Sequence, residues 1–554
     1  MKTINGHHLK QMIISGANNL FNCYPEIDAL NVFPVPDGDT GTNMNLTMTS
    51  GSKEVVNIDT TNIYDVAKTF SRGLLMGARG NSGVILSQIF RGFAIGLEGK
   101  KEANCYDFAD ALISAKDVAY KAVMKPVEGT ILTVIRESTV ALKKYVDDLE
   151  KPITIKECMA ILLKEAKASL ERTPELLPVL KEVGVVDSGG AGLIKVLEGF
   201  ESALNDHIIE RFQATVQQNE TENKTASAQS KIANEEFGYC TEFIMKLSPE
   251  KEGKKNFVSS RFTSVLQNHG NSIVVVQDDD MVKVHIHTLK PGNIFNYAQQ
   301  FGEFITLKVE NMQLQHSHIT ENDKKEEKTE VVKKEKKKYA IISVSVGEGL
   351  NQMFRDLRVD EIVSGGQTMN PSTEDFVEAI NRLNAENIFI LPNNSNIVMA
   401  ANQASQVVEG VNCKVIPTKT IPQGMVACMM FNPYCEVDEN FEQMSEAIGN
   451  VKTGQVTFAI KDTNINGIEI KENYFMGLDG KNIITCKEDK VDATITLLDS
   501  MIDENSEIVT LIAGEDAKED ETKKIVNYLN EKYPVEVDVK LGQQPVYSYI
   551  IGVE

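Results

Sequence analysis

The chain has 554 residues, a formal net charge of −22 at pH 7 and eight scattered cysteines. Its negative charge argues against binding to nucleic acid or to an anionic membrane surface, because no basic surface is available to displace counterions from phosphates. The length predicts three or so domains of roughly 100–200 residues each, and the scattered cysteines do not predict a disulfide framework.

The sequence also lacks the segments that direct a chain to a membrane or out of the cell. No apolar run reaches the roughly 18 residues that a spanning helix needs. The N-terminal segment Met1-Lys-Thr-Ile-Asn5 lacks the apolar stretch of a signal peptide. We therefore expect a cytoplasmic protein without a transmembrane segment.

Two polar stretches divide the sequence. Residues 215–231 are rich in Gln, Asn, Thr and Ser, and residues 321–338 form a run of mixed charge. Because both signs are interleaved in the second stretch, we interpret it as a solvated linker rather than a binding arm. The predicted domains are residues 1–205, 233–318 and 339–554, with linkers over residues 206–232 and 319–338.

The first predicted domain is all-α. Apolar residues recur at helical spacing around Leu9 to Leu20 and again around Phe108 to Val123, and residues 154–170 repeat the pattern. No convincing alternating strand interrupts them. The chemistry of this domain is expected in the polar loops between its helices.

The most informative loop is the segment LNVFPVPDGDTGTNM, residues 30–44. Asp37 and Asp39 lie on one tight turn, and two carboxylates close together suit Mg²⁺. The next residues open a helix, where backbone N–H groups and the helix dipole favour phosphate; they are Thr40, Gly41, Thr42 and Asn43. The alternative for Asp-Gly-Asp in isolation is a plain capped turn.

Two further glycine-rich loops open helices. Asn81, Ser82 and Gly83 belong to the segment Gly-Ala-Arg-Gly-Asn-Ser-Gly that ends at residue 83. Asp187, followed by Ser188 and Gly189, opens another helix. We interpret both loops as phosphate sites; the alternative for the first is a close helix crossing that requires small residues.

Residues 233–316 predict a small βαββ-type module with strands over 272–277 and 281–287. His285 and His287 lie two residues apart and so on one face of the second strand. Cys240, from a neighbouring strand, completes a Cys/His₂ set that suits Zn²⁺. The alternative is a pair of half-buried histidines near an unrelated thiol.

From residue 339 onward, strand-like and helical runs alternate, which is typical of an α/β domain with a largely parallel sheet. The predicted runs are residues 340–346, 376–383, 387–391 and 397–408. The loops 364–372 and 391–396 follow strand-like runs, where open α/β sheets bind ligands. The alternative is that both are ordinary Asn/Pro/Ser turns.

The loops of the first domain, taken together, resemble a known family. DGDTGTNM, GNSG, Glu128-Gly-Thr-Ile-Leu132 and Asp187-Ser-Gly-Gly190 resemble the motifs of the nucleotide-binding domain of dihydroxyacetone kinases. The resemblance implies a barrel of antiparallel helices that binds ATP and two Mg²⁺ ions, with Thr130 among the nucleotide-binding residues. We therefore predict Asp37 and Asp39, together with Asn31, as the catalytic residues, which act as Mg²⁺ ligands.

The longer forms LNVFPVPDGDTGTNM and SRGLLMGARGNSGVILSQIFRG resemble the catalytic subunit of bacterial fatty acid kinase, and this resemblance covers the whole chain. It implies a DegV-like C-terminal domain and a separate DegV-like carrier protein that holds the fatty acid. The carboxylate of the fatty acid would be phosphorylated to an acyl-phosphate for phospholipid synthesis. The resemblance also supports the zinc site in the middle domain. It does not decide whether the chain forms a homodimer.

One position departs from the pattern of dihydroxyacetone kinases, which have a third metal-binding aspartate five residues before the Asp-Gly-Asp pair. That position here is Val32, which has no side-chain oxygen. We expect Asn31 to supply a neutral amide oxygen as the third ligand, and Asp28 is the less favoured substitute. The metal site would then have less ligand charge than in the sugar kinases.

A carboxylate acceptor is already ionised at pH 7 and needs no general base. In agreement, none of His7, His8 and His207 lies in a candidate loop. Two alternatives remain open from the sequence. One is a glycerone or sugar-type kinase of the dihydroxyacetone kinase family, and the other is a non-enzymatic, lipid-responsive scaffold.

Overall fold

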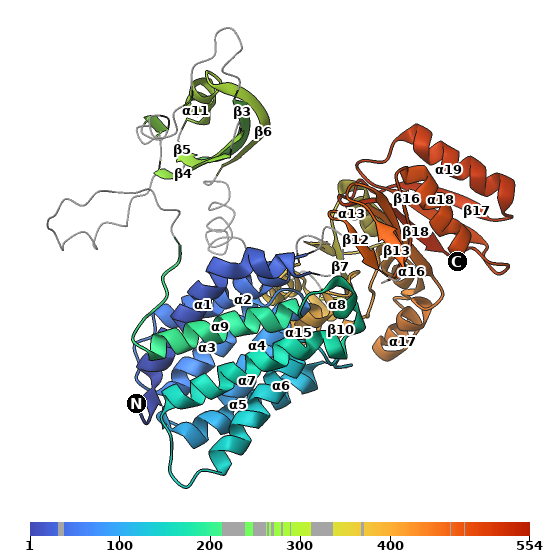
Figure 1. Ribbon diagram of the computed structural model, residues 1–554. Coiled ribbons are helices and arrows are strands. Elements are labelled where there is room, and N and C mark those ends of the chain that lie inside the picture. Colours follow the sequence, from blue (N-terminus) through green and yellow to red (C-terminus); the bar gives the residue numbers. More distant parts are fainter. Residues whose placement is uncertain are drawn as a thin grey trace, which may run out of the picture. The chain divides into compact units, whose positions relative to one another are not determined.

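We describe a computed structural model of the chain (Figure 1). Residues 1–215 and 335–554 form one compact unit, and residues 216–334 form a second. None of the described helices is both long and apolar enough to cross a membrane. The residues described are 1–31, 38–123, 125–212, 239–247, 257, 262, 265–266, 271–278, 281–288, 290–311, 336–366, 370–465, 467–480 and 482–554. The predicted linker stretch 215–231 lies outside these residues, as does 321–335.

The first part of the chain is helical, as predicted, apart from a short pair of strands, β1 (Ile4–Asn5) and β2 (Glu102–Ala103). Successive helices pack on one another, and α9 packs on both α7 and α1, so that the last helix is also a neighbour of the first. The helices lie side by side in Figure 1, coloured blue to green. They are α1 (Gly6–Ala29), α2 (Thr40–Val56), α3 (Ile63–Gly77), α4 (Gly80–Gly96), α5 (Cys105–Ala122), α6 (Ile131–Asp147), α7 (Ile155–Leu176), α8 (Pro178–Val183) and α9 (Ser188–Leu204).

Local sequence sets where several of these helices begin. The Thr154 side chain accepts from the Glu157 N–H while the Glu157 side chain accepts from the Thr154 N–H, a capping box that starts α7. Asn104 and Asp107 start α5 in the same way. Apolar faces of the helices then share one continuous core, in which the Phe90 ring contacts two other phenylalanines.

The second unit contains an antiparallel sheet in the order β4-β5-β3-β6. Alternate residues of β3 and β5 are buried, among them Phe243 and Val284, and they pack against Ile294 of α11. The two predicted strands are confirmed, and β6 adds a strand after the helix. The elements are β3 (Tyr239–Leu247), β4 (Asn271–Asp278), β5 (Met281–Thr288), α11 (Pro291–Ala298) and β6 (Gly302–Asn311).

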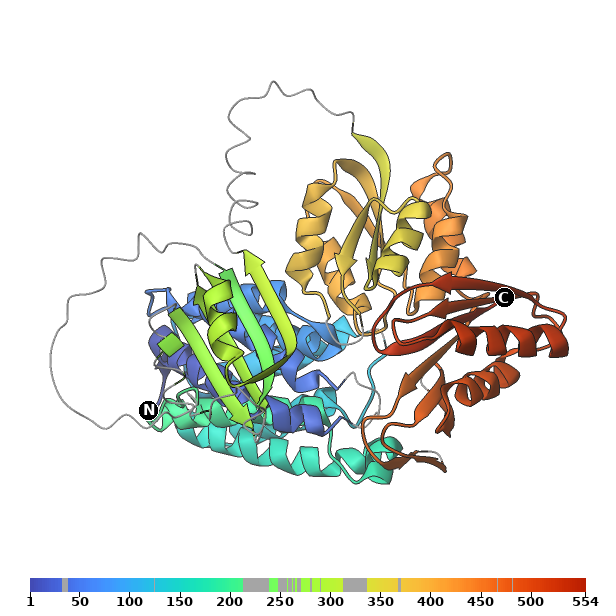
Figure 2. The same ribbon diagram turned by 90° about the horizontal axis from the view of Figure 1, so that it is seen from above.

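The C-terminal region begins with a parallel sheet in the order β10-β9-β7-β8, as predicted. In Figure 2, helices of this region flank its yellow and light-orange strands on both sides. Lys337 and Lys338 already belong to β7, so the second predicted linker ends earlier than expected. The elements are β7 (Lys337–Ser345), α13 (Glu348–Asp356), β8 (Glu361–Ser364), α14 (Thr373–Arg382), β9 (Ala385–Leu391), α15 (Val398–Val407), β10 (Asn412–Val415), α16 (Ile421–Met430) and α17 (Val437–Ala447).

The prediction of a largely parallel sheet is wrong for the rest of this region. A mixed sheet in the order β15-β14-β11-β18-β16-β17 follows, and only its β16–β17 pair is parallel. Gly480, with a φ of +57°, lies in the tight turn between β14 and β15, and such hairpins pair antiparallel. The elements are β11 (Lys452–Phe458), the small hairpin β12 (Thr463–Ile465) and β13 (Ile468–Ile470), β14 (Phe475–Asp479), β15 (Asn482–Lys487), α18 (Lys490–Met501), β16 (Ile508–Ala513), α19 (Glu519–Lys532), β17 (Glu536–Leu541) and β18 (Tyr547–Val553).

Candidate functional site

Asp39 lies directly before α2, while Asp37 is outside the described residues. The Asp39 side chain does not cap α2, although its backbone carbonyl accepts from the Asn43 N–H. Instead, Asp39 Oδ2 accepts a hydrogen bond of 2.6 Å from Asn370 Nδ2 in the C-terminal region. The plain capped turn, considered as an alternative for the Asp-Gly-Asp sequence, therefore does not describe Asp39.

The start of α2 is capped from α1 by Asp28. Asp28 Oδ1 accepts from the Gly41 N–H at 2.6 Å and from the Thr42 N–H at 3.1 Å. Asp28 Oδ2 accepts from the Thr42 hydroxyl at 2.7 Å. Two of the N–H donors expected to bind phosphate are thus engaged by a carboxylate of the chain itself. Sequence reasoning treated Asp28 only as a substitute metal ligand and missed this role.

Asn31 lies beside the acidic turn, as expected of a ligand candidate. A Cβ placed on Gly38 would stand 3.4 Å from Asn31 Cβ and 3.5 Å from Asn31 Nδ2. The Asn31 backbone carbonyl accepts a hydrogen bond of 2.7 Å from Lys461 Nζ, which holds the end of α1 against the C-terminal region. Whether the side chain binds metal stays a prediction.

The glycine-rich loop before α4 shows the close helix crossing that was given as its alternative interpretation, while its role as a phosphate site stays a prediction. A Cβ on Gly83 would clash with Thr47 Oγ1 of α2, so the close helix crossing is present at this residue. Asn81 and Ser82 lie in the first turn of α4. Asn81 Nδ2 donates to Asn396 Oδ1 at 3.1 Å, again in the C-terminal region, and Ser82 is half-buried.

Asp187 joins the N-termini of two helices. Its carboxylate accepts from the Gly190 N–H at 2.7 Å, within α9, and from the backbone N–H of Ile131, at the start of α6. Burial raises the pKa of Asp187 to about 6, against the opposing effect of these hydrogen bonds. A Cβ on Gly189 would stand 3.3 Å from Ile131 Cβ, so Ser188 and Gly189 begin α9 directly against α6.

Thr130 is the N-cap of α6, and its hydroxyl donates to the Val127 carbonyl at 2.8 Å. The neighbouring Glu128 accepts from the Thr133 hydroxyl at 2.6 Å and from Arg136 Nη2 at 2.8 Å. Burial alone would raise the pKa of Glu128, but these hydrogen bonds hold it below its usual value. The sequence motif included Glu128 without a role, and the structure shows that it anchors the loop before α6.

The N-termini of α2, α4, α6 and α9 lie close together at one end of the helical domain. Gly83 of α4 packs on Thr47 of α2, and a Cβ on Gly192 of α9 would stand 2.6 Å from Met44 Sδ of α2. The Asp187 carboxylate joins α9 to α6. Helix N-termini carry partial positive charge, so a polyanionic ligand such as a nucleotide phosphate chain would bind here through the donors that Asp28 and Asp187 do not already engage.

Two loops of the C-terminal region that we predicted as ligand loops reach this end. Arg79 Nη1 donates to the Asn370 carbonyl at 2.9 Å and lies 3.4 Å from Asp375 Oδ2. The backbones of Arg79 and Ser372 form an isolated β-bridge. Loop 364–372 thus contacts Asp39 and Arg79, and loop 391–396 contacts Asn81.

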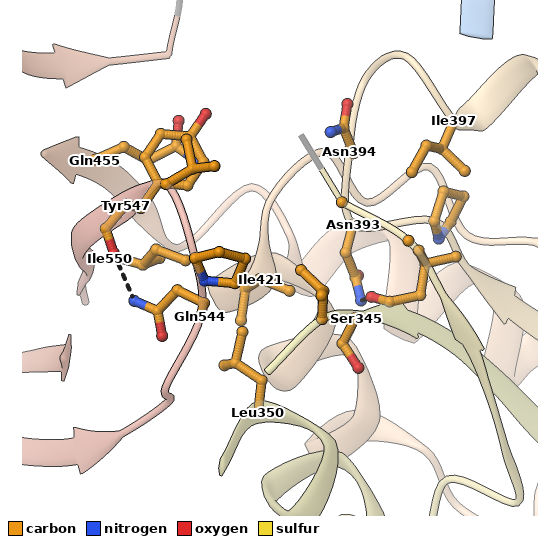
Figure 3. Close-up of a pocket in the computed structure, with 17 residues that line it drawn as sticks. Ser345, Leu350, Asn393, Asn394, Ile397, Ile421, Gln455, Gln544, Tyr547 and Ile550 are labelled. Carbon is orange, nitrogen blue, oxygen red and sulfur yellow. Dashed lines mark hydrogen bonds between the residues drawn. The ribbon is translucent and has the colours of Figure 1, made fainter. Parts of the chain in front are cut away.

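The same two loops also line a cavity of about 100 Å³ within the C-terminal region (Figure 3). Asn393 of one loop faces Gln544, in the loop between β17 and β18, and Tyr547 of β18 across it, with apolar residues such as Ile421 between them. The amide nitrogens of Asn393 and Gln544 both donate to backbone carbonyls. The cavity is smaller than the roughly 300–1,000 Å³ of small-molecule sites.

The register of the middle sheet bears on the expected zinc ligands. Cys240 of β3 is the direct partner of His287 of β5, and His285 pairs with Glu242. Cys240 therefore comes from the neighbouring strand, as the prediction required. Within the part of the chain whose side chains are described, no group of three or more His, Cys, Asp or Glu could hold a metal ion. The side chains of these three residues, and the whole of Asp37, lie outside the part of the chain that the structure describes.

Known families match the chain in three consecutive segments. Residues 34–202 match the DAK2 domain. Residues 236–319 match the middle domain, and residues 340–554 the C-terminal part, of the FakA-like fatty acid kinase family. The helical region is thus a kinase domain.

Relatives match over the full length. The chain is 48% identical over 559 residues to Protein YloV of Bacillus subtilis strain 168, covering 100% of both chains. It is 47% identical over 554 residues to an uncharacterized protein of Staphylococcus aureus strain USA300, covering 100% of this chain and 99% of that one.

Solved structures match parts of the chain. A DegV family protein from Corynebacterium glutamicum aligns with a TM-score of 0.32 at 13% identity, over 39% of this chain and 95% of that one. The dihydroxyacetone kinase of C. freundii aligns with a TM-score of 0.27 at 21% identity, over 35% of this chain and 34% of that one. With a kinase domain followed by two matched segments and full-length relatives, the chain belongs to the FakA-like fatty acid kinase family.

Proposed function

We propose that the chain is an ATP-dependent kinase that phosphorylates the carboxylate of a fatty acid held by a separate, DegV-like fatty-acid-binding carrier protein. The family supports phosphoryl transfer. The observation that carries the proposal is that the N-termini of α2, α4, α6 and α9 lie at one end of the kinase domain, the end at which Asp39 precedes α2. Such an end can bind a phosphate chain and leave the γ-phosphate accessible to an acceptor.

The reaction balances without a general base. A carboxylate oxygen of the fatty acid attacks the γ-phosphorus, the bond from that phosphorus to the β,γ-bridging oxygen breaks, and ADP leaves with the electron pair. The product is an acyl-phosphate. The acceptor is ionised at pH 7, so the chain has to position two anions in line rather than remove a proton. No histidine of the helical region lies in the candidate loops, which fits this requirement.

The described residues also fit a hard cation at this site. The Asp39 carboxylate faces Asn370, and the Oδ1 atoms of Asn370 and Asn81 are buried with no donor among the described residues. Carboxylate and amide oxygens are ligands that Mg²⁺ accepts. Asp39, with Asp37 and Asn31, would hold two Mg²⁺ ions. Bound Mg²⁺ neutralises charge on the phosphates during transfer.

The test uses purified protein, Mg²⁺–ATP and a DegV-like carrier loaded with a fatty acid. We expect ATP turnover only when the loaded carrier is present, with the acyl-phosphate trapped as its hydroxamate. The matched control is the same carrier without fatty acid. Turnover with dihydroxyacetone and no carrier would instead support a sugar-type kinase. No turnover with any acceptor, although nucleotide binds, would support a scaffold.

A further inference from the structure

The Asp39 carboxylate has a partner that lies 331 positions away in the sequence. Asn370 Nδ2 donates to Asp39 Oδ2 at 2.6 Å, and Asn370 is only 2% exposed. The orientation of the Asn370 amide is settled chemically, because an ionised carboxylate only accepts and so must face the NH₂ group. The amide oxygen of Asn370 then points away from a donor and is buried without one among the described residues.

Asn370 is itself held firmly against the kinase domain. Arg79 Nη1 donates to the Asn370 carbonyl at 2.9 Å, and the Thr373 N–H donates to the Ala78 carbonyl at 3.2 Å. Gly80 has a φ of +58°, and a Cβ there would stand 3.5 Å from Asn370 Nδ2 and 2.6 Å from Asn43 Nδ2. The absence of a side chain at residue 80 leaves room for both amides, and that of Asn370 contacts Asp39.

We propose that Asn370 is a positioning residue that orients the Asp39 carboxylate for Mg²⁺. This inference rests on the proposed function, in which Asp39 is a magnesium ligand. An ionised carboxylate offers about four lone-pair positions. The hydrogen bond from Asn370 uses one of them and restricts rotation of the group, which would favour one orientation of the carboxylate toward a cation. Carboxylates that bind metals are commonly oriented in this way by outer partners.

A consequence is that the kinase domain does not complete its own metal site. The residue that orients Asp39 belongs to the C-terminal region, so Mg²⁺ affinity is coupled to the contact between loop 364–372 and the kinase loops. Coupling of this kind is reciprocal. Mg²⁺ bound at Asp39 should therefore strengthen the contact through Arg79 and Asn370.

The test measures how binding of a fluorescent ADP analogue to the full chain depends on Mg²⁺, with no fatty acid or carrier present. In Asn370→Ala, we expect the Mg²⁺ concentration for half-maximal nucleotide binding to rise about 10- to 100-fold, the range found when outer partners of metal ligands are removed. Nucleotide affinity at saturating Mg²⁺ should stay within about twofold of wild type. Asn370→Leu keeps the branched shape of the side chain but has no hydrogen-bond donor, and it should show the same rise in the Mg²⁺ requirement. This second variant provides the test if Asn370→Ala folds poorly.

The control is Gln403→Ala. Gln403 Nε2 donates to the Leu75 carbonyl at 2.9 Å, so this variant loosens the same contact between the two regions without touching Asp39. Its Mg²⁺ dependence should match wild type. An equal shift in Gln403→Ala, or no shift in either Asn370 variant, would overturn the proposal while leaving the kinase function intact. Nucleotide binding by wild type that is independent of Mg²⁺ would overturn both.

Discussion

The Asp28 carboxylate accepts hydrogen bonds from both the backbone N–H and the hydroxyl of Thr42. This pair ties the last turn of α1 to the first turn of α2, which follows Asp39. Because the N-terminus of α2 would otherwise keep unpaired donors, Asp28 acts as a helix cap supplied from another helix. The contact gives a first prediction.

Asp28→Ala should lower the stability of the protein by about 1–2 kcal/mol, the usual effect of losing a helix cap. Asn31→Ala should leave stability nearly unchanged and raise the Mg²⁺ requirement for nucleotide binding. Chemical denaturation and Mg²⁺ titrations of both variants check this. An unchanged denaturation midpoint in Asp28→Ala would show that the cap contributes little.

Asp37→Asn and Asp39→Asn should each abolish phosphotransfer while the fold stays intact. Each change removes one negative charge from the expected metal site but keeps the shape of the side chain, so the packing of α2 should not change. Circular dichroism and thermal unfolding check the fold, and acyl-phosphate formation checks the activity. Asp59→Asn, on an exposed loop away from the site, is the matched control. Full activity in either site variant would exclude that residue as a metal ligand.

The raised pKa of Asp187 predicts a dependence of stability on pH. Burial moves the pKa from 3.8 to about 6, so the folded chain binds this proton more tightly than the unfolded chain between these values. The stabilisation of the fold by proton binding to Asp187 is therefore complete below pH 3.8 and is lost as the pH rises through about 6.

Asp187→Asn removes this titration but keeps an oxygen that can accept the Gly190 N–H. When the pH is raised from 5 to 7.5, the free energy of unfolding of Asp187→Asn should rise by about 1 kcal/mol relative to that of wild type. Asp187→Ala loses the cap as well and should be less stable than Asp187→Asn at both pH values. Denaturation curves at the two pH values measure the difference. A gap between Asp187→Asn and wild type that does not change with pH would contradict the prediction.

The middle domain gives a prediction about zinc. A fragment of residues 233–316 should copurify with Zn²⁺, because β3 and β5 bring the Cys240 and His287 positions opposite each other. Cys240→Ser, or the combined changes His285→Ala and His287→Ala, should release the metal. Elemental analysis of the purified fragments measures this. A zinc-free wild-type fragment would rule the site out.

Much of the architecture follows from the sequence alone, because its signals are local. Helical periodicity predicted the all-α kinase domain, and strand-like runs predicted β4, β5, β7 and β9 and the parallel pairing of the first C-terminal sheet, but not β8 and β10. The motif loops were identified because each combines glycines with polar residues at a helix start. Capping boxes such as Thr154 with Glu157 act over three residues, and such short-range contacts can be predicted from residue types.

Tertiary structure alone decided which groups meet. Asp28 reaches α2 across 14 positions of the chain, and Asn370 reaches Asp39 across 331, with no local pattern to pair them. The mixed order of the second C-terminal sheet depends likewise on which strands become neighbours, since β11 pairs with β18 at the end of the chain. Sequence periodicity specifies the faces that an element buries, whereas partners at long range are selected by packing of the whole core.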